Sequence, residues 1–176
     1  MGVTASFPAR FQLVLAANPC PCGNAGVRDA ECTCTPFARR RYLGRLSGPL
    51  LDRVDIQLDV PRVTAAQLRV ASDGPVTTSE AARSRVREAR ERAAQRLEGM
   101  PWRLNAHAPG AWLRSQGAPH PGSTASLDRA LERGALTMRG YDRVLRIAWT
   151  LADLDGVDRP GLEQIGRALY LRKAAT

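Results

Sequence analysis

The chain has 176 residues, 44% of them hydrophobic and 5% aromatic, so it can bury one ordinary core or two small ones built mostly from Leu, Val and Ala. Its 26 basic and 17 acidic residues leave a formal net charge of +9, which favours polyanionic partners, above all nucleic acid. The sequence has no apolar run long enough for a transmembrane helix and no signal peptide, so we expect a cytoplasmic protein without a membrane partner.

Two strands are predicted near the N-terminus. Residues 11–17 (FQLVLAA) form an apolar run with Gln12 as its one polar residue, which is typical of a strand buried on both faces of a parallel sheet. Residues 54–60 (VDIQLDV) alternate apolar and polar side chains up to Pro61, which favours a second strand. This part of the chain is therefore predicted to have an α/β fold.

All four cysteines lie between the two predicted strands, as two Cys-x-Cys pairs. They are Cys20, Cys22, Cys32 and Cys34. Four thiolates at about 2.3 Å from one ion make a closed tetrahedral Zn(II) site, which braces a loop and leaves no coordination position for catalysis. The alternatives are disulfides or other redox use, which a reducing compartment disfavours, and a vestigial site.

The second half of the chain is predicted to be helical. Residues 72–78 contain Gly74 and Pro75 and are expected to link two bodies. Beyond them, apolar side chains recur every three or four residues, which predicts amphipathic helices. The predicted helices cover residues 79–98, 127–133, 137–155 and about 160–172.

The helix predicted at residues 79–98 has a strongly basic exposed side. Its apolar stripe consists of Ala82, Val86, Ala89, Ala93 and Leu97, and arginines fill much of the remaining surface. Such a surface is the footprint expected of a nucleic-acid-binding protein. GC-rich coding is the alternative, because Lys173 is the single lysine of the chain and such a bias arises without functional selection.

Asn18 and Arg53 stand beside the predicted strands, where an ATPase places functional side chains. Asn18 directly follows residues 11–17, and its amide can orient the water that attacks a γ-phosphate. Alternatively, the Asn-Pro sequence only turns the chain. Arg53 precedes the second strand and suits an arginine finger, or else it forms an ion pair with Asp52 or Asp55.

Arg139 is the third candidate for nucleotide contact. It lies in the first turn of the helix predicted at residues 137–155, where a basic side chain opposes the helix dipole. A bound phosphate would offset that unfavourable interaction. The alternative is a solvated basic face that continues through Arg143 and Arg146.

Three strings of the sequence carry a resemblance to a known family. They are AANPCPCG at residues 16–23, SGPLLDRVD at residues 47–55 and MRGYDRVLRIAWTLADL at residues 138–154. In combination they resemble the ComM/YifB family of magnesium-chelatase-like AAA+ ATPases, and the resemblance covers nearly the whole chain. It implies that Asn18 is the sensor 1 residue, Arg53 a trans-acting arginine finger and Arg139 the sensor 2 contact to an ATP phosphate.

The resemblance also implies a fold and an activity. Residues 1–71 are expected to be an α/β remnant of an AAA+ core with a few strands and the zinc loop, residues 72–78 a linker, and residues 79–176 an all-α helical lid. Members of the family form hexameric rings that use ATP and Mg(II) to move on DNA, with branch migration in natural transformation and recombination as the associated activity. Insertion of magnesium into porphyrin is not expected.

The sequence lacks two elements that such a motor needs. It contains no Gly-x-x-x-x-Gly-Lys-Ser/Thr loop and no apolar strand that ends in Asp-Glu. We therefore expect a fragment that is inactive alone and works with the missing N-terminal ATPase portion or with neighbouring subunits. The competing hypothesis is a stand-alone zinc-containing module that binds nucleic acid and has no ATPase activity.

Overall fold

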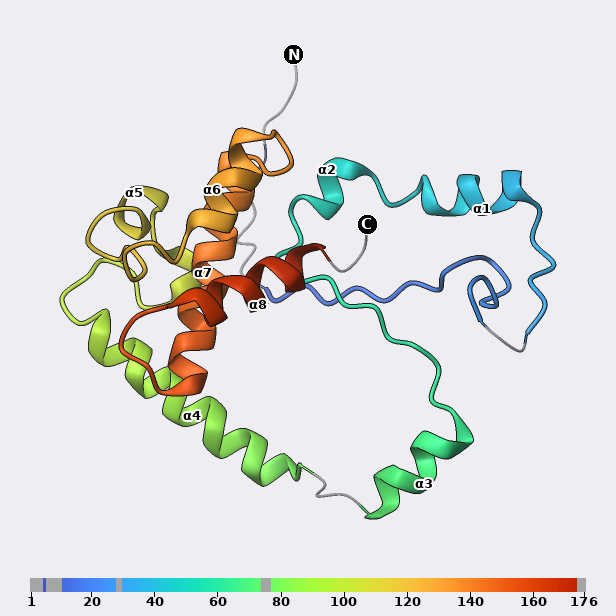
Figure 1. Ribbon diagram of the computed structural model, residues 1–176, viewed down its shortest axis with the longest axis horizontal. Coiled ribbons are helices and arrows are strands. Elements are labelled where there is room, and N and C mark those ends of the chain that lie inside the picture. The colour runs from blue at the N-terminus through green and yellow to red at the C-terminus, as the bar shows by residue number, and fades with distance from the viewer. Residues whose placement is uncertain (1–4, 6–10, 28–29, 74–76, 174–176) are drawn as a thin grey trace. The chain divides into compact units, whose positions relative to one another are not determined.

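The computed structural model describes residues 5, 11–27, 30–73 and 77–173, which fall into two compact units, Met1–Gly48 and Pro49–Thr176. The first unit contains helix α1 (Pro36–Leu43), and α2 (Gly48–Leu51) begins at the boundary (Figure 1). The remaining elements are α3 (Ala65–Asp73), α4 (Ser79–Arg96), the short 3-10 helix η1 (Asn105–His107), α5 (Gly110–Leu113), α6 (Ala125–Glu132), α7 (Met138–Asp155) and α8 (Leu162–Lys173).

The prediction of an α/β domain is wrong, because no residue in the described part of the chain belongs to a β-strand. A strand obtains its ladder hydrogen bonds from a neighbouring strand, and no described segment pairs with residues 11–17 in this way. Their side chains are open to solvent, with Phe11 74% and Val14 81% exposed. The apolar run has the side chains of a buried strand but lacks a partner.

The second predicted strand, residues 54–60, is also not a strand. The backbone in the middle of this segment is instead hydrogen-bonded to α8, since the N–H of Gln57 donates to the carbonyl of Leu171 at 2.8 Å. Its apolar side chains are not buried, and Leu58 and Val60 are 63% and 84% exposed. The alternation of apolar and polar residues therefore does not correspond to a sheet face here.

Helix α7 is the centre of the second unit, and the prediction of a helix at residues 137–155 is confirmed. The hydroxyl of Thr137 accepts from the N–H of Gly140 at 3.1 Å and caps its start, and Gly156 ends it in the left-handed region at φ 72°. Ten of its residues are buried, and α4, α5, α6, α8 and η1 all pack against it (Figure 1). The core is therefore a single layer of helices around α7.

Helix α4 only partly follows its prediction. It begins after the cap residue Thr78 and ends at Arg96. Ala89 and Leu97 of the predicted apolar stripe are buried, but Val86 is 44% exposed. The C-terminal half of α4 thus packs on the core, whereas its N-terminal half presents both the stripe and the arginines to solvent.

The region between α3 and α4 was predicted as a linker at residues 72–78. Residues 72 and 73 close helix α3, and Thr78 caps α4. Residues 74–76 lie outside the described residues, so the division into residues 1–71 and 79–176 stays a prediction.

A buried ionic cluster joins α4 to α7. The guanidinium of Arg96 binds both carboxylate oxygens of Asp153, which is only 3% exposed, and stacks at 4.1 Å over the ring of Trp149. The amide of Asn105 bridges the two, accepting from Arg96 at 2.8 Å and donating to Asp153 at 2.8 Å. The side-chain partners of Asp153 therefore come from α4 and η1 and not from α7 itself.

Replacing Asp153 by Ala is expected to destabilise the second unit by about 3 kcal/mol, because the change leaves the Arg96 guanidinium, whose side chain is 19% exposed, without its counter-ion. The free energy of unfolding in urea measures the effect. Asp158→Ala is the matched control, since Asp158 is exposed nearby and its loss should cost less than about 0.5 kcal/mol. Equal destabilisation by the two variants would contradict the role given to the cluster.

Candidate functional site

The four predicted metal ligands come together in the first unit. A tight turn brings back the chain after Cys20, with the N–H of Gly23 donating to the Cys20 carbonyl at 3.0 Å and Gly23 at φ 80°. The N–H of Ala25 then donates to the Cys20 sulfur at 3.3 Å. An N–H group that donates to a sulfur favours its thiolate form.

The four sulfurs lie within 4.8 Å of one another. The Cys20 sulfur is 3.3 Å from that of Cys22 and 3.8 Å from that of Cys32, and the Cys22 and Cys32 sulfurs are 3.7 Å apart. Ligands at about 2.3 Å from a tetrahedral ion are about 3.8 Å from each other, whereas a disulfide joins its sulfurs at about 2.05 Å. The cysteines are unpaired, and their spacing fits one ion held by four thiolates.

The electrostatics of the cluster favour one thiolate at neutral pH. The backbone N–H of Asn24 and the neighbouring thiols, first that of Cys20, lower the pKa of Cys22 to about 6. At Cys34 the backbone N–H of Cys22 acts in the same direction, but the Cys22 and Cys20 sulfurs and burial outweigh it and raise the pKa to about 11. At Cys20 burial opposes the thiolate, but the N–H of Ala25 and the Cys32 and Cys34 sulfurs outweigh it and lower the pKa, whereas the pKa of Cys32 is raised. Without a cation, Cys32 and Cys34 therefore resist deprotonation, and a bound dication would remove that resistance.

Asn18, the predicted sensor 1 residue, lies beside this turn and is exposed. A Cβ placed on Gly23 would be 4.0 Å from the Asn18 amide, so the side chain lies near the turn that carries Cys20 and Cys22.

Arg53, the predicted finger, is exposed and donates to the carbonyl of Pro49 at 2.9 Å. Its neighbouring carboxylates are occupied elsewhere: Asp52 pairs with Arg172 at 2.6 Å, and Asp55 with Arg143 at 3.0 Å. Within the residues that the structure describes, no carboxylate pairs with Arg53. The alternative of an ion pair with Asp52 or Asp55 is thus not what the structure has.

The three arginines at the start of α7 differ in their surroundings. Arg139, the predicted sensor 2 residue, is exposed in the first turn. Arg143 holds Asp55 and is 16% exposed, and Arg146 donates twice to the carbonyl of Ala108, at 2.9 and 3.1 Å. Arg139 alone of the three has no bonded partner in the described chain, so the basic face predicted here reduces to a single available guanidinium.

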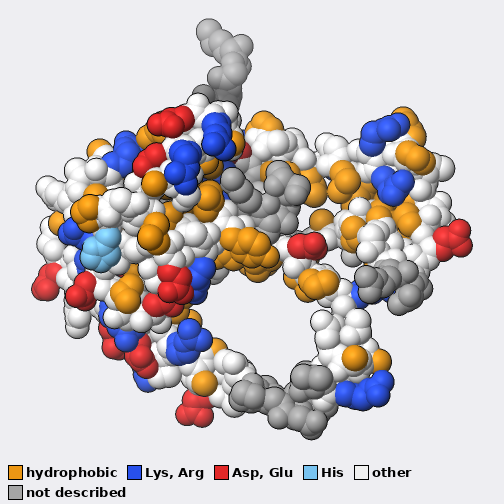
Figure 2. Space-filling model, viewed as in Figure 1, with side chains coloured by type: hydrophobic (Ala, Val, Ile, Leu, Met, Phe, Trp, Pro, Cys, Tyr) orange, Lys and Arg blue, Asp and Glu red, His pale blue; other side chains and the backbone are white. Residues whose placement is uncertain are grey.

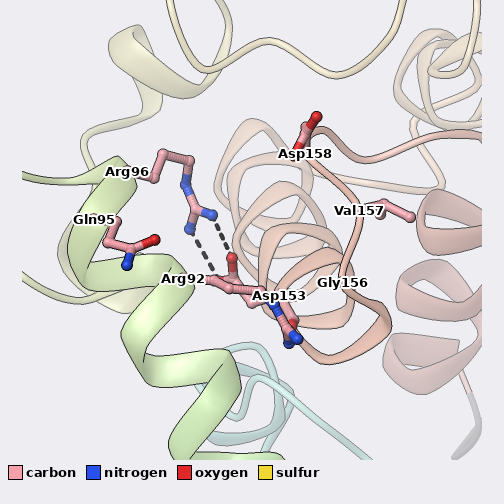
Figure 3. Close-up of a pocket in the computed structure, with 7 residues that line it drawn as sticks. All are labelled: Arg92, Gln95, Arg96, Asp153, Gly156, Val157 and Asp158. Carbon is pink, nitrogen blue, oxygen red and sulfur yellow. Dashed lines mark hydrogen bonds and ion pairs between the residues drawn. The ribbon is translucent and has the colours of Figure 1, made fainter.

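A pocket of about 400 Å³ opens between α4 and the end of α7 (Figure 3). Its residues are Arg92, Gln95, Arg96, Asp153, Gly156, Val157 and Asp158. Arg96 points at the carboxylate of Asp153, and Arg92 donates to the Asp153 carbonyl at 2.8 Å. Because its arginines are already bonded to the end of α7, the pocket is part of the packing of the two helices.

Sequence reasoning missed this ionic cluster, although one signal was present. Asp153 falls on the apolar stripe of α7, between the buried Ala152 and the end of the helix. An acidic residue at a core position is almost never fully buried without a cationic partner.

No described helix is long and apolar enough to span a membrane.

Comparison with known proteins gives two matching families. "Magnesium chelatase, subunit ChlI" matches residues 2–68, and "Magnesium chelatase, subunit ChlI C-terminal" matches residues 76–172. An uncharacterized protein of Mycobacterium tuberculosis is 48% identical over 96% of this chain and 33% of its own length. YifB of Salmonella typhimurium is 34% identical over 95% of this chain and 32% of its own length. The competence protein ComM of Haemophilus influenzae is 33% identical over 94% of this chain and 31% of its own length. The chain spans about a third of the length of these relatives.

The pKa values of the cluster predict how the metal-free, reduced protein titrates. As the pH rises, ultraviolet thiolate absorbance should appear first near pH 6, from Cys22, and the last step should fall near pH 11, from Cys34. Below pH 6 the first thiolate is protonated and its absorbance is lost. Cys22→Ser should remove the early step, whereas a single step of all four thiols in the ordinary range would contradict this charge distribution.

Proposed function

Since the chain belongs to the magnesium chelatase ChlI family, with ComM/YifB-like relatives, we propose that it is the C-terminal part of a ring-forming AAA+ ATPase that acts on DNA. In this proposal the helices of residues 79–176 form the lid. ATP and Mg(II) are bound mainly by parts of the assembly that this chain lacks, because its sequence has no phosphate-binding loop. The chain alone is therefore inactive.

The state of Arg53 is the observation that supports the proposal best. A finger must keep its guanidinium free of internal carboxylates, so that it can meet the charge that develops on a transferred phosphoryl group. Arg172 and Arg143 bind the two carboxylates that flank Arg53 and leave its guanidinium exposed. We assign Arg53 as the trans arginine finger on this basis.

Asn18 and Arg139 receive the two sensor roles. Asn18 is exposed and lies near the thiol turn, which suits a side chain that orients a water molecule. Arg139 is exposed and without an acidic partner on α7, which suits contact with an ATP phosphate. Both roles need the complete assembly.

DNA is the proposed substrate of the intact motor. The net charge of +9 favours a polyanion, and the relative from Haemophilus influenzae is named a competence protein. We infer that the motor moves branched DNA during natural transformation and recombination, as a homo-hexamer.

Zn(II) is the ion we assign to the thiol cluster, with a structural role. Four thiolates match the preference of zinc for sulfur and for tetrahedral geometry, and they fill every coordination position. The cluster also supports the second candidate function, a zinc-containing nucleic-acid-binding module without ATPase activity. Such a module would need only the first unit, which holds the cysteines, and basic helices such as α4.

The zinc assignment predicts about one equivalent of metal in protein purified under reducing conditions, as one four-thiolate site requires. Replacing Cys20 and Cys32 by Ser together should abolish metal binding, measured by elemental analysis. The core of the second unit supplies no ligand to this cluster, so the helices around α7 should remain folded by circular dichroism. A metal-free wild-type protein would overturn the assignment.

The finger assignment can be tested in a chimera in which this chain replaces the matching third of the Mycobacterium tuberculosis relative. We expect DNA-stimulated ATP hydrolysis by the chimera. Arg53→Ala should lower kcat by about 10³-fold or more, because the guanidinium stabilises charge only in the transition state. Arg53→Lys should recover little of the rate, since an ammonium lacks the planar fork.

Arg133→Ala is the matched control, because Arg133 is also exposed, at the end of α6, and is not one of the proposed nucleotide contacts. Its chimera should hydrolyse ATP at the unchanged rate. If Arg53→Ala behaves like this control, the finger assignment falls. If the unsubstituted chimera binds DNA but never hydrolyses ATP, the nucleic-acid-binding module becomes the better account.

A further inference from the structure

Helix α1 has no apolar core to hold it. None of its eight residues, Pro36–Leu43, is buried. Helices of this length are marginally stable in water when isolated, because forming the first turn costs conformational free energy and only a few hydrogen bonds offset it. Something at its ends must therefore stabilise α1.

The start of α1 is adjacent to the thiol cluster. The cap residue Thr35 directly follows Cys34, and its hydroxyl accepts from the N–H of Ala38 at 3.2 Å. Pro36 occupies the first turn, where its fixed φ favours the helix. An ion that holds the Cys34 sulfur would thereby hold the cap in place, so α1 and metal binding are coupled.

The surface of α1 is strongly basic. No acidic residue occurs between Glu31 and Asp52, whereas this interval contains Arg39, Arg40, Arg41 and Arg45. Arg40 and Arg41 are exposed and lie in the last turn. Figure 2 shows basic side chains next to hydrophobic ones over this helix. Charge complementarity therefore selects a polyanionic partner.

An aromatic ring accompanies these charges. Phe37 is 67% exposed, and Arg40 and Arg41 follow it at three and four residues, so the three side chains share one face. An acidic protein surface would use the arginines but would leave the ring in water. A single strand of nucleic acid uses both, because bases stack on exposed rings and phosphates bind guanidinium groups.

We propose that α1 is a single-stranded DNA contact element ordered by the metal, with Phe37 stacking on a base and Arg40 and Arg41 binding the adjacent phosphates. The proposal depends on the proposed function only in taking DNA as the polyanion. It assigns no role to Arg53 or Arg139. Its test is therefore independent of ATP hydrolysis.

The test measures binding of a fluorescent single-stranded oligonucleotide to the metal-loaded, full 176-residue chain by anisotropy, at several salt concentrations. The double substitution Arg40→Ala and Arg41→Ala should weaken binding about tenfold and reduce the salt slope by about 1.4, the value expected for two lost phosphate contacts on a single strand. Phe37→Leu should also weaken binding about tenfold, because leucine is apolar and favours helix but cannot stack.

The matched control removes two charges elsewhere, with Arg103→Ala and Arg133→Ala, both exposed in the second unit. This control should bind nearly as the unsubstituted chain does. Chelation of the metal should lower the affinity to that of the Arg40→Ala, Arg41→Ala variant, with loss of helical circular dichroism equal to about one short helix.

Three results would overturn the proposal. They are equal losses for the α1 and control double variants, unchanged affinity of Phe37→Leu, and unchanged affinity after the metal is removed. The first would leave DNA binding and the finger assignment standing. Conversely, a chimera that fails to hydrolyse ATP while α1 binds DNA as stated would remove the motor function and keep this contact.

Discussion

Arginine–carboxylate contacts decide which charges of the second unit are available to other molecules. Arg96 binds Asp153, Arg143 binds Asp55, and Arg172 binds Asp52. The arginine side chains are at most 19% exposed, and loss of the carboxylate would leave a largely buried charge uncompensated, so these arginines belong to the fold. Because the acidic residues near the finger segment are used in this way, Arg53 keeps an exposed guanidinium.

The sequence predicted the helices better than the N-terminal part of the fold. Helices α7 and α8, and the C-terminal half of α4, carry apolar side chains that pack on neighbours within this chain, so their periodicity was sufficient to predict them. Residues 11–17 have the composition of a buried strand, but composition does not show whether a pairing partner exists. With no partner in the described residues, this segment forms no strand.

The candidate site was predictable where its geometry is local. The cysteine pairs are close in sequence and joined by glycine turns, so their convergence could be inferred from spacing. Whether each arginine is ion-paired or left exposed could not be inferred from the sequence. Arg172 meets Asp52 across 120 residues, and Arg96 meets Asp153 across 57. Local sequence thus identified the basic residues, but only the tertiary structure separated those that stabilise the fold from those left exposed.

The two units differ in what can hold them together, and this difference bears on function. The second unit has an apolar core around α7, whereas Cys20 is the only buried residue among the described residues of the first. A metal on four thiolates takes the place of a core in small domains, since binding free energy becomes folding free energy. Asn18 lies near the thiol turn, and α1 begins directly after Cys34. A single ion would therefore order both the proposed sensor and the proposed DNA contact, so that loss of metal removes the two together while the helices around α7 persist.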